Sequence, residues 1–126
     1  MKLIVNNSSM VPIYEQLVVQ IKGMIVKGEL AADTPLPSVR SLSGELKISS
    51  LTVKKAYDAL EAEGLVKTVH GKGTYVVEAN RNLMLEEQRK EVESILDDAL
   101  RRGKLYGLTA LELREMFEIL LHEYVL

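Results

Sequence analysis

The sequence predicts a mainly α protein with one small β-hairpin, divided into two modules. Three observations support this fold class. Apolar residues recur at spacings of three and four along five stretches of the 126-residue chain, which is typical of amphipathic helices. Two short β-prone runs flank a glycine-containing turn. Strand-like sequence gives way to a charged helical pattern near residue 78, so we expect one module over residues 1–78 and a second over residues 79–126.

The composition is that of a globular protein, and it excludes several chemistries. Hydrophobic residues make up 47% of the chain, and sixteen basic side chains stand against eighteen acidic ones. Cysteine is absent, which excludes disulfides and thiolate metal ligands. The longest uncharged stretch has twelve residues, far short of the roughly 18 that a membrane helix requires. We expect a cytoplasmic protein that spans no membrane.

Charge is divided unevenly between the two modules. Residues 1–80 hold nine basic and eight acidic side chains, whereas residues 81–126 hold seven and ten. The acidic excess therefore belongs to the second module. The basic excess of the first module is small, so its function must be inferred from where the basic residues lie in the fold.

The first module begins with a β-prone run at residues 3–5 and continues into three predicted helices. Pro12 suits the first position of the first helix, which ends at Gly28. Ser38 is the expected N-cap of a short second helix, and a third, Ser-capped helix ends at Gly64. The residues expected to face inward are Ile13, Leu17, Ile21, Met24, Ile25, Val39, Leu42, Leu46, Val53, Ala56, Tyr57 and Leu60.

A hairpin and a loop complete the first module. Residues 65–69 alternate apolar and polar side chains, residues 74–77 are rich in β-formers, and Gly71 and Gly73 mark the turn between them. Residues 31–37 contain two prolines and are expected to form a loop between the first two helices.

Two short helices joined by a tight turn, with a hairpin after the second, form the winged variant of the helix-turn-helix, which binds DNA. The hydroxyls and backbone N–H groups at the start of the third helix suit phosphate oxygens. Lys54 and Lys55 point away from the apolar face, within reach of a major groove, although a plain solvated helix face is the alternative. Asp58 would be repelled by DNA, so only the first two turns are expected to enter the groove. The candidate DNA-binding residues here are Ser49, Ser50, Leu51, Thr52, Lys54 and Lys55.

Six short motifs follow one another along the first module. They are PIYEQ from Pro12, GEL from Gly28, LPSVR from Leu36, TVKKA from Thr52, EGLV from Glu63 and GKGTYV from Gly71. In this order and spacing they resemble the DNA-binding domain of the GntR family of bacterial transcription regulators, over about two thirds of the chain. The helical remainder resembles that of the YtrA-type subfamily, in which a small helical tail serves dimerisation and no large effector-binding domain is present.

The resemblance implies roles for individual residues. Arg40, at the end of the LPSVR motif, would reach a guanine edge or a nearby phosphate; a structural ion pair with Glu45 or Asp33 is the alternative. Thr52 and Lys54 would contact the operator from the third helix. The residues implied to enter the minor groove from the wing tip, or to contact a phosphate there, are His70, Gly71 and Lys72.

The chain also departs from the family pattern. The loop that commonly reads Lys-Pro-Gly-Asp in relatives is Ala-Ala-Asp-Thr over residues 31–34, and the glycine often found in the helix-turn-helix turn is Lys47. Ser50 and Leu51 stand where relatives often carry Arg or Asn, so an apolar contact with a thymine methyl replaces polar base contacts. The operator sequence therefore cannot be taken from the family.

The second module contains two helical patterns. A narrow apolar stripe over residues 83–102 is accompanied by favourable Asp–Arg pairs four residues apart. Thr109 and Glu112 form an expected capping box at the start of the second helix. The two helices carry more apolar surface than they can bury against each other, which favours a symmetric homodimer. The expected interface residues are Leu96, Leu100, Leu113, Met116, Phe117, Leu120, Leu121 and Tyr124.

These observations predict a homodimeric transcription regulator, and more specifically a repressor, that binds a pseudo-palindromic operator in double-stranded DNA. The alternative is a protein-interaction adaptor that docks a partner through its helical tail and keeps a vestigial winged domain. No enzyme is expected, because no nucleophile, base and orienting group are gathered in one segment. No cofactor or metal is expected, and the existence of a small-molecule effector stays open.

Overall fold

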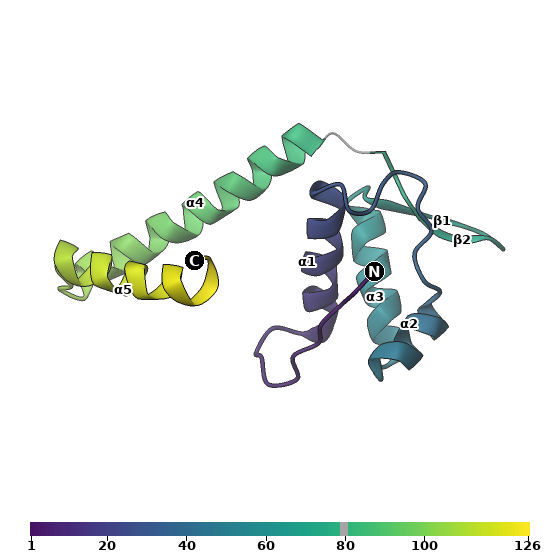
Figure 1. Cartoon of the computed structure of the whole chain (residues 1–126), viewed down its shortest axis with the longest axis horizontal. Coiled ribbons are helices and arrows are strands. Elements are labelled where there is room, and N and C mark those ends of the chain that lie inside the picture. The colour runs from purple at the N-terminus through teal and green to yellow at the C-terminus, as the bar shows by residue number, and fades with distance from the viewer. Residues whose placement is uncertain (79–80) are drawn as a thin grey trace. The chain divides into compact units, whose positions relative to one another are not determined.

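The computed structural model describes residues 1–78 and 81–126 and divides into two units, Met1–Arg81 and Asn82–Leu126. Its described elements are five helices and a two-stranded antiparallel sheet (Figure 1), which confirms the predicted fold class. They are α1 (Ile13–Val26), α2 (Val39–Leu46), α3 (Ser50–Ala62), β1 (Val66–Val69), β2 (Gly73–Val76), α4 (Arg81–Leu105) and α5 (Ala110–Tyr124).

The three helices of the first unit pack around one apolar core. All four residues that the sequence predicts on the inner face of α3 are buried, because their spacing of three and four places them on one side of the helix. Burying one large aliphatic side chain contributes roughly 1.5–3 kcal/mol, so this core supplies most of the stability of the unit. The largest fully buried side chains are Leu17, Ile21, Val26, Leu42, Val53, Leu60, Val66 and Val76.

Side-chain caps define where α2 and α3 begin. The Ser38 and Ser49 hydroxyl oxygens each accept a hydrogen bond from a backbone N–H in the first turn of their helix, at 3.0 and 3.1 Å. Lys47 lies between the two helices with a φ of +56°, in the left-handed region that reverses the chain. α1 begins one residue later than predicted, because Pro12 is its N-cap residue.

The β-prone run at residues 3–5 forms no strand. The Ile4 N–H donates to Gln20 Oε1 at 2.8 Å, and the Ile4 carbonyl accepts from Gln20 Nε2 at 2.7 Å. The Asn6 N–H donates to the side-chain oxygen of Gln16 at 2.9 Å. Amide side chains of α1 therefore bond the backbone groups that a neighbouring strand would otherwise have paired.

The predicted hairpin is present. β1 and β2 pair with Val66 opposite Val76 and Val69 opposite Gly73, which leaves a three-residue tip. Gly71 and Gly73 have φ values of +77° and +122°, a region that only glycine adopts without strain.

The segment before α2 is a loop, as predicted, and it also bonds to the edge of this sheet, which the sequence does not indicate. The Thr34 carbonyl accepts from the Val76 N–H at 2.9 Å, and the Leu36 N–H donates to the Thr74 carbonyl at 2.8 Å. Pro35 lies between them in an isolated bridge, which is possible because the bonds come from its neighbours. β2 therefore has backbone partners on both of its sides.

In the second unit, α4 and α5 approach closely beside the turn that joins them. A Cβ added to Gly103 of α4 would lie 2.8 Å from Leu113 Cδ2 of α5, so the glycine permits this approach. The predicted capping box is formed, with the Thr109 hydroxyl accepting from the Glu112 N–H and the Glu112 carboxylate accepting from the Thr109 N–H, both at 3.1 Å. The two predicted Asp–Arg pairs of α4 are formed at 3.0 and 3.1 Å.

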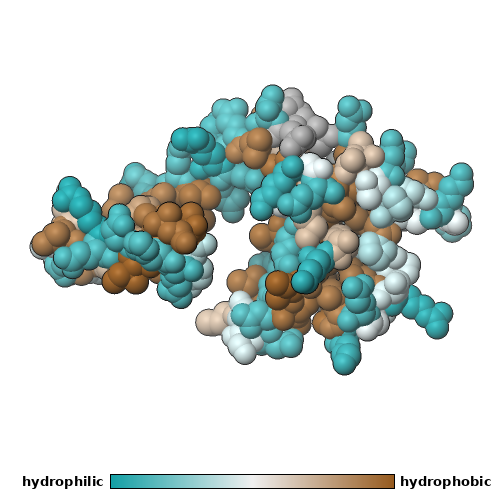
Figure 2. Space-filling model, in the orientation of Figure 1, coloured by the Kyte–Doolittle hydropathy of each residue, from teal (hydrophilic) through white to brown (hydrophobic). Residues whose placement is uncertain are grey.

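The apolar faces of these two helices are largely uncovered. α5 has no buried residue, and Figure 2 shows apolar side chains at the surface of both helices. Leu96 on α4 and Phe117 and Leu120 on α5 expose between 42% and 48% of their surface. Uncovered apolar faces are common at sites of protein–protein interaction.

Candidate nucleic-acid interface

The start of α3 presents most of the predicted contact residues to solvent. Ser49, Ser50 and Leu51 are exposed, Leu51 by 77%, and Thr52 is half-buried. Fewer backbone donors are available here than the sequence suggests, because the N–H groups of residues 51–53 already bond to Ser49. The N-terminal end of α3 can therefore contact a ligand mainly through its side chains, and less through free backbone N–H groups.

A chain of hydroxyl groups fixes α3 against α2. The Ser50 Oγ lies 3.1 Å from the Ser43 Oγ, and the Ser43 hydroxyl also bonds to the Arg40 carbonyl oxygen at 3.0 Å. Ser43 is buried and Ser50 is exposed, so these bonds are partly shielded from water. The arrangement holds the two helices of the helix-turn-helix in a fixed relation.

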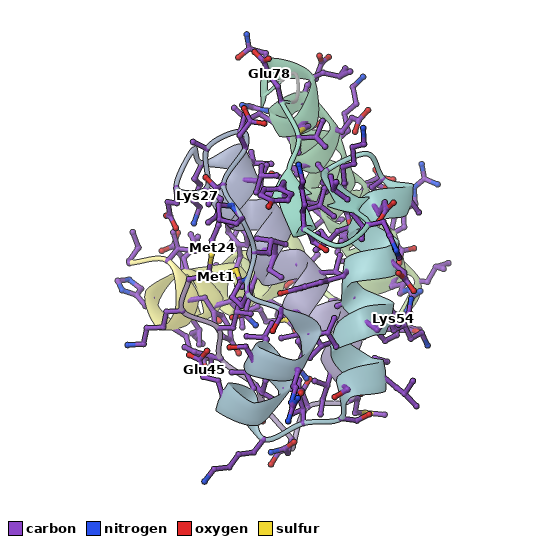
Figure 3. The ribbon with its side chains drawn as sticks, turned by 90° about the vertical axis from the view of Figure 1, so that its right-hand side faces the viewer. Met1, Met24, Lys27, Glu45, Lys54 and Glu78 are labelled. Carbon is purple, nitrogen blue, oxygen red and sulfur yellow. The ribbon has the colours of Figure 1, made fainter. Side chains whose placement is uncertain are left out.

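The two lysines of α3 are each held by another side chain of the first unit. The Lys54 Nζ lies 2.9 and 3.2 Å from the two carboxylate oxygens of Asp58, one turn later. The Lys55 Nζ lies 4.1 Å from the centroid of the Tyr14 ring on α1, a cation–π contact. Figure 3 shows Lys54 on the outer side of α3. Because both lysines are exposed, these contacts are worth about 1 kcal/mol or less.

Arg40 is exposed on α2, and it forms no ion pair among the residues that the structure describes. The alternative pairs with Glu45 or Asp33 are not formed. Its guanidinium is therefore available to an external acceptor.

Tyr57 fixes the segment that leads into α2. Its hydroxyl donates to the Pro37 carbonyl at 2.7 Å. Burial raises the pKa of Tyr57 from its ordinary value near 10 to about 12, so the hydroxyl remains a protonated donor up to a more alkaline pH. This bond links the inner face of α3 to the backbone immediately before the N-cap of α2.

The wing tip is exposed and supported from behind. The Tyr75 hydroxyl donates to the carbonyl oxygen at position 72 at 3.1 Å, which fixes the backbone of the tip. The side chains at the tip are free to meet a ligand, with no ion pair recorded there in the described part of the chain. The tip residues are His70, Gly71 and Lys72.

The sequence does not identify several side chains that support the candidate interface residues. Tyr14 contacts Lys55, and Ser43 contacts Ser50, only because the helices pack together. No pattern of neighbouring residues in the sequence predicts these contacts. The partnership of Asp58 with Lys54 does have a signal, since the two are four residues apart on one helix.

Neither a metal-binding cluster nor a membrane-spanning helix is present among the described residues. Among them, no group of three or more His, Cys, Asp or Glu side chains could hold a metal ion. Each helix of the described part is too short or too polar to cross a membrane.

Comparison with known sequences identifies relatives. Residues 13–76 match the family described as bacterial regulatory proteins, gntR family. The chain is 35% identical over 99 residues to the HTH-type transcriptional repressor YtrA of Bacillus subtilis, covering 75% of this chain and 76% of YtrA. It is 33% identical over 104 residues to the uncharacterized HTH-type regulator YhcF of the same species, covering 82% and 85%. These relatives are described as regulators, and none of them as an enzyme.

Solved structures share the fold. YtrA from Sulfolobus acidocaldarius, a GntR-family transcription factor, matches with a TM-score of 0.59 and 34% identity, covering 73% of this chain and 97% of that one. The AraR DNA-binding domain in complex with operator ORX1 matches with a TM-score of 0.55 and 28% identity, covering 61% and 96%. The predicted YtrA-like winged helix-turn-helix is therefore confirmed, and the chain belongs to the GntR family of bacterial transcription regulators.

Proposed function

We propose that the chain is a homodimeric transcriptional repressor that binds a pseudo-palindromic operator, with α3 in the major groove of each half-site. The observation that carries the proposal is the exposed first turn of α3, whose Ser50 hydroxyl lies 3.1 Å from the Ser43 hydroxyl of α2. The AraR domain of similar fold is bound to an operator, and YtrA is named a repressor.

The proposed DNA contacts divide between direct readout and anchoring. Leu51 is placed to meet a thymine methyl, and Arg40 to meet a guanine edge or a phosphate. The remaining groups supply hydroxyl, ammonium, imidazole or backbone contacts. They are Ser49, Ser50, Thr52, Lys54, Lys55, His70, Gly71 and Lys72.

The proposed dimer uses the uncovered apolar faces of α4 and α5. Residues 1–78 would form the reading module and residues 79–126 the dimerisation module. Two copies that bury these faces against each other would remove from water a surface that one chain leaves exposed. A bacterial protein that binds an operator would act in the cytoplasm, and this supports the cytoplasmic location that we propose.

Selection of DNA from a random-sequence duplex library with the full chain tests this function. The enriched duplexes should contain an inverted repeat with half-site centres about one helical turn, roughly 10 bp, apart. Footprinting on such a duplex should protect both half-sites. Failure to enrich or retard any duplex at low salt would reject the proposal in favour of an adaptor that binds a protein through α4 and α5.

A further inference from the structure

The face of the hairpin that packs on the core changes from apolar to polar along its length. Val66 and Val76 form a cross-strand pair in the core of the first unit, and each is 2% exposed. Because side chains alternate between the two faces of a strand, the next pair outward on this face is Thr68 opposite Thr74. Thr68 is exposed and Thr74 is half-buried. On this face, apolar packing therefore holds the inner end of the hairpin, and polar contacts hold the outer end.

A carboxylate of α3 bonds to the outer pair. The Thr68 hydroxyl donates to Glu61 Oε2 at 2.8 Å, and the Thr68 Oγ1 lies 3.2 Å from the Thr74 Oγ1. A hydroxyl has one proton, and that of Thr68 is used by the carboxylate, so the Thr74 hydroxyl is the donor in the second bond. Glu61 therefore joins the last turn of α3 to both strands of the hairpin.

A second route joins β2 to α3 through the segment before α2. The Leu36 N–H donates to the Thr74 carbonyl at 2.8 Å, and the carbonyl of Pro37 accepts from the Tyr57 hydroxyl at 2.7 Å. Tyr57 and Glu61 are four residues apart on α3, about one turn. The two routes meet at Thr74, one at its side chain and the other at its backbone. Together they form a closed hydrogen-bonded ring that contains the recognition helix and the wing.

We propose that Glu61 is a positioning residue, which through Thr68 fixes the wing tip relative to the first turns of α3. This inference rests on the proposed function, in which α3 lies in the major groove and the tip, residues 70–72, contacts the DNA beside it. Two elements that are already fixed relative to each other lose less conformational freedom when both bind. The ring therefore favours simultaneous contact with the major groove and with the adjacent minor groove.

The first test is Thr68→Val in the full chain, which removes the hydroxyl and keeps the shape of the side chain. Affinity is measured against a duplex that the wild-type chain has selected. Thr68→Val should bind this duplex about two- to tenfold more weakly, the range that corresponds to one hydrogen bond. Thr68→Ser keeps the hydroxyl and should bind like the wild-type chain.

A matched pair of variants at Glu61 separates the hydrogen bond from the charge. Glu61→Gln keeps a side-chain oxygen that can accept from Thr68, whereas Glu61→Ala does not. Both remove one negative charge, so both gain the same general attraction to the phosphate backbone. Glu61→Ala should therefore bind the selected duplex about two- to tenfold more weakly than Glu61→Gln. In a Thr68→Val background, the two variants should bind equally.

Footprinting separates positioning of the wing from a general weakening of the complex. At saturating protein, dimethyl sulfate reports contact at guanine N7 in the major groove, and hydroxyl radicals report contact along the minor groove. Thr68→Val should keep the major-groove protection and lose minor-groove protection beside each half-site. When His70 and Lys72 are both replaced by Ala, Thr68→Val should cause no further loss of affinity, because the contacts that the ring positions are absent.

Three results would overturn the role of Glu61. They are wild-type affinity in Thr68→Val, an equal loss of protection in both grooves, and an undiminished loss of affinity after the tip residues are replaced. A selected duplex that the wild-type chain protects in the major groove alone would also overturn it, while the proposed function would stand. If the wild-type chain selects no duplex at all, the proposed function itself fails, and this outcome appears before any variant is made.

Discussion

At the scale of single residues, Lys47 shows how a departure from the family pattern is accommodated. With φ +56° and ψ +48° it adopts the left-handed conformation, which costs an ordinary residue about 1–2 kcal/mol relative to the right-handed one. This explains why glycine is common at the position in relatives. The turn keeps its shape because the flanking helices are capped and packed on both sides.

Lys47→Gly should therefore stabilise the protein. We expect the free energy of unfolding to rise by about 0.5–1 kcal/mol, because glycine adopts this conformation without steric penalty but loses more entropy on folding. Urea denaturation measures the change. Lys47→Ala is the matched control, since it removes the charge but keeps the Cβ; a gain equal to that of glycine would show that backbone strain is not the cause.

Tyr57 predicts a pH dependence of stability. Burial raises its pKa from about 10 in the unfolded chain to about 12 in the folded protein, so the protonated hydroxyl is favoured by folding. Its contribution is complete below pH 10 and is lost as the pH rises from about 10 to about 12. Urea midpoints measured between pH 9 and 11.5 should fall less steeply for Tyr57→Phe than for the wild-type chain. If the urea midpoints of the two proteins fall in parallel with pH, burial does not raise the pKa of Tyr57.

Arg40 is the residue whose removal should weaken operator binding most selectively. Without a recorded ion pair in the described part of the chain, its loss should leave stability unchanged within about 0.5 kcal/mol. Arg40→Ala should lower affinity for the selected duplex by about 1–3 kcal/mol if it reads a guanine. Binding to duplexes with each base pair substituted locates that guanine. A uniform loss across all duplexes would assign Arg40 to a phosphate instead.

At the scale of elements, sequence patterns predicted the features that depend on residues close together in the chain, namely helix faces and helix caps. The inner face of α3, its serine cap and the capping box of α5 were all predicted correctly, since each depends on residues within one or two turns. The pairing of Thr34 and Leu36 with β2 was missed, because it joins segments far apart in the chain and a proline lies between them. The β-prone run at residues 3–5 forms no strand, because a side chain of α1 bonds the backbone groups that a neighbouring strand would have paired.

The capping box of α5 should contribute measurably to the second unit. Thr109→Ala removes the hydroxyl that accepts from the Glu112 N–H, and we expect the free energy of unfolding to fall by about 1 kcal/mol. Thermal unfolding followed by circular dichroism at 222 nm checks this. Thr109→Ser keeps the hydroxyl and should behave like the wild-type chain. A loss in both variants would point to the threonine methyl group.

At the scale of the whole molecule, the sequence predicted which of the candidate residues are exposed better than it predicted their partners within the fold. The spacing of the six motifs indicated α3 and the wing, and the candidate residues there are exposed except Thr52, which is half-buried. The internal partners of Lys55 and Ser50 could not be predicted, because Tyr14 and Ser43 reach them only through the packing of α1 and α2. The operator contacts and the dimer remain predictions.

The dimer is tested by paired substitutions on α5. Leu120, in the predicted interface, is 48% exposed, and Ile119 beside it is 67% exposed and outside that interface. Leu120→Asp should convert the dimer to monomer in sedimentation velocity, since an unpaired carboxylate would be buried at the interface. Ile119→Asp should remain dimeric. If Leu120→Asp also stays dimeric, the assignment of this face is wrong.

The double pairing of β2 has a consequence for how the wing could adapt to DNA. With backbone partners on both sides, β2 cannot swing as a unit without breaking bonds to β1 and to the segment before α2. Adjustment is confined to the three residues of the tip. Such a wing tolerates little variation in the width of the minor groove, so sequences that narrow or widen the groove would differ in binding energy without any change in the bases contacted.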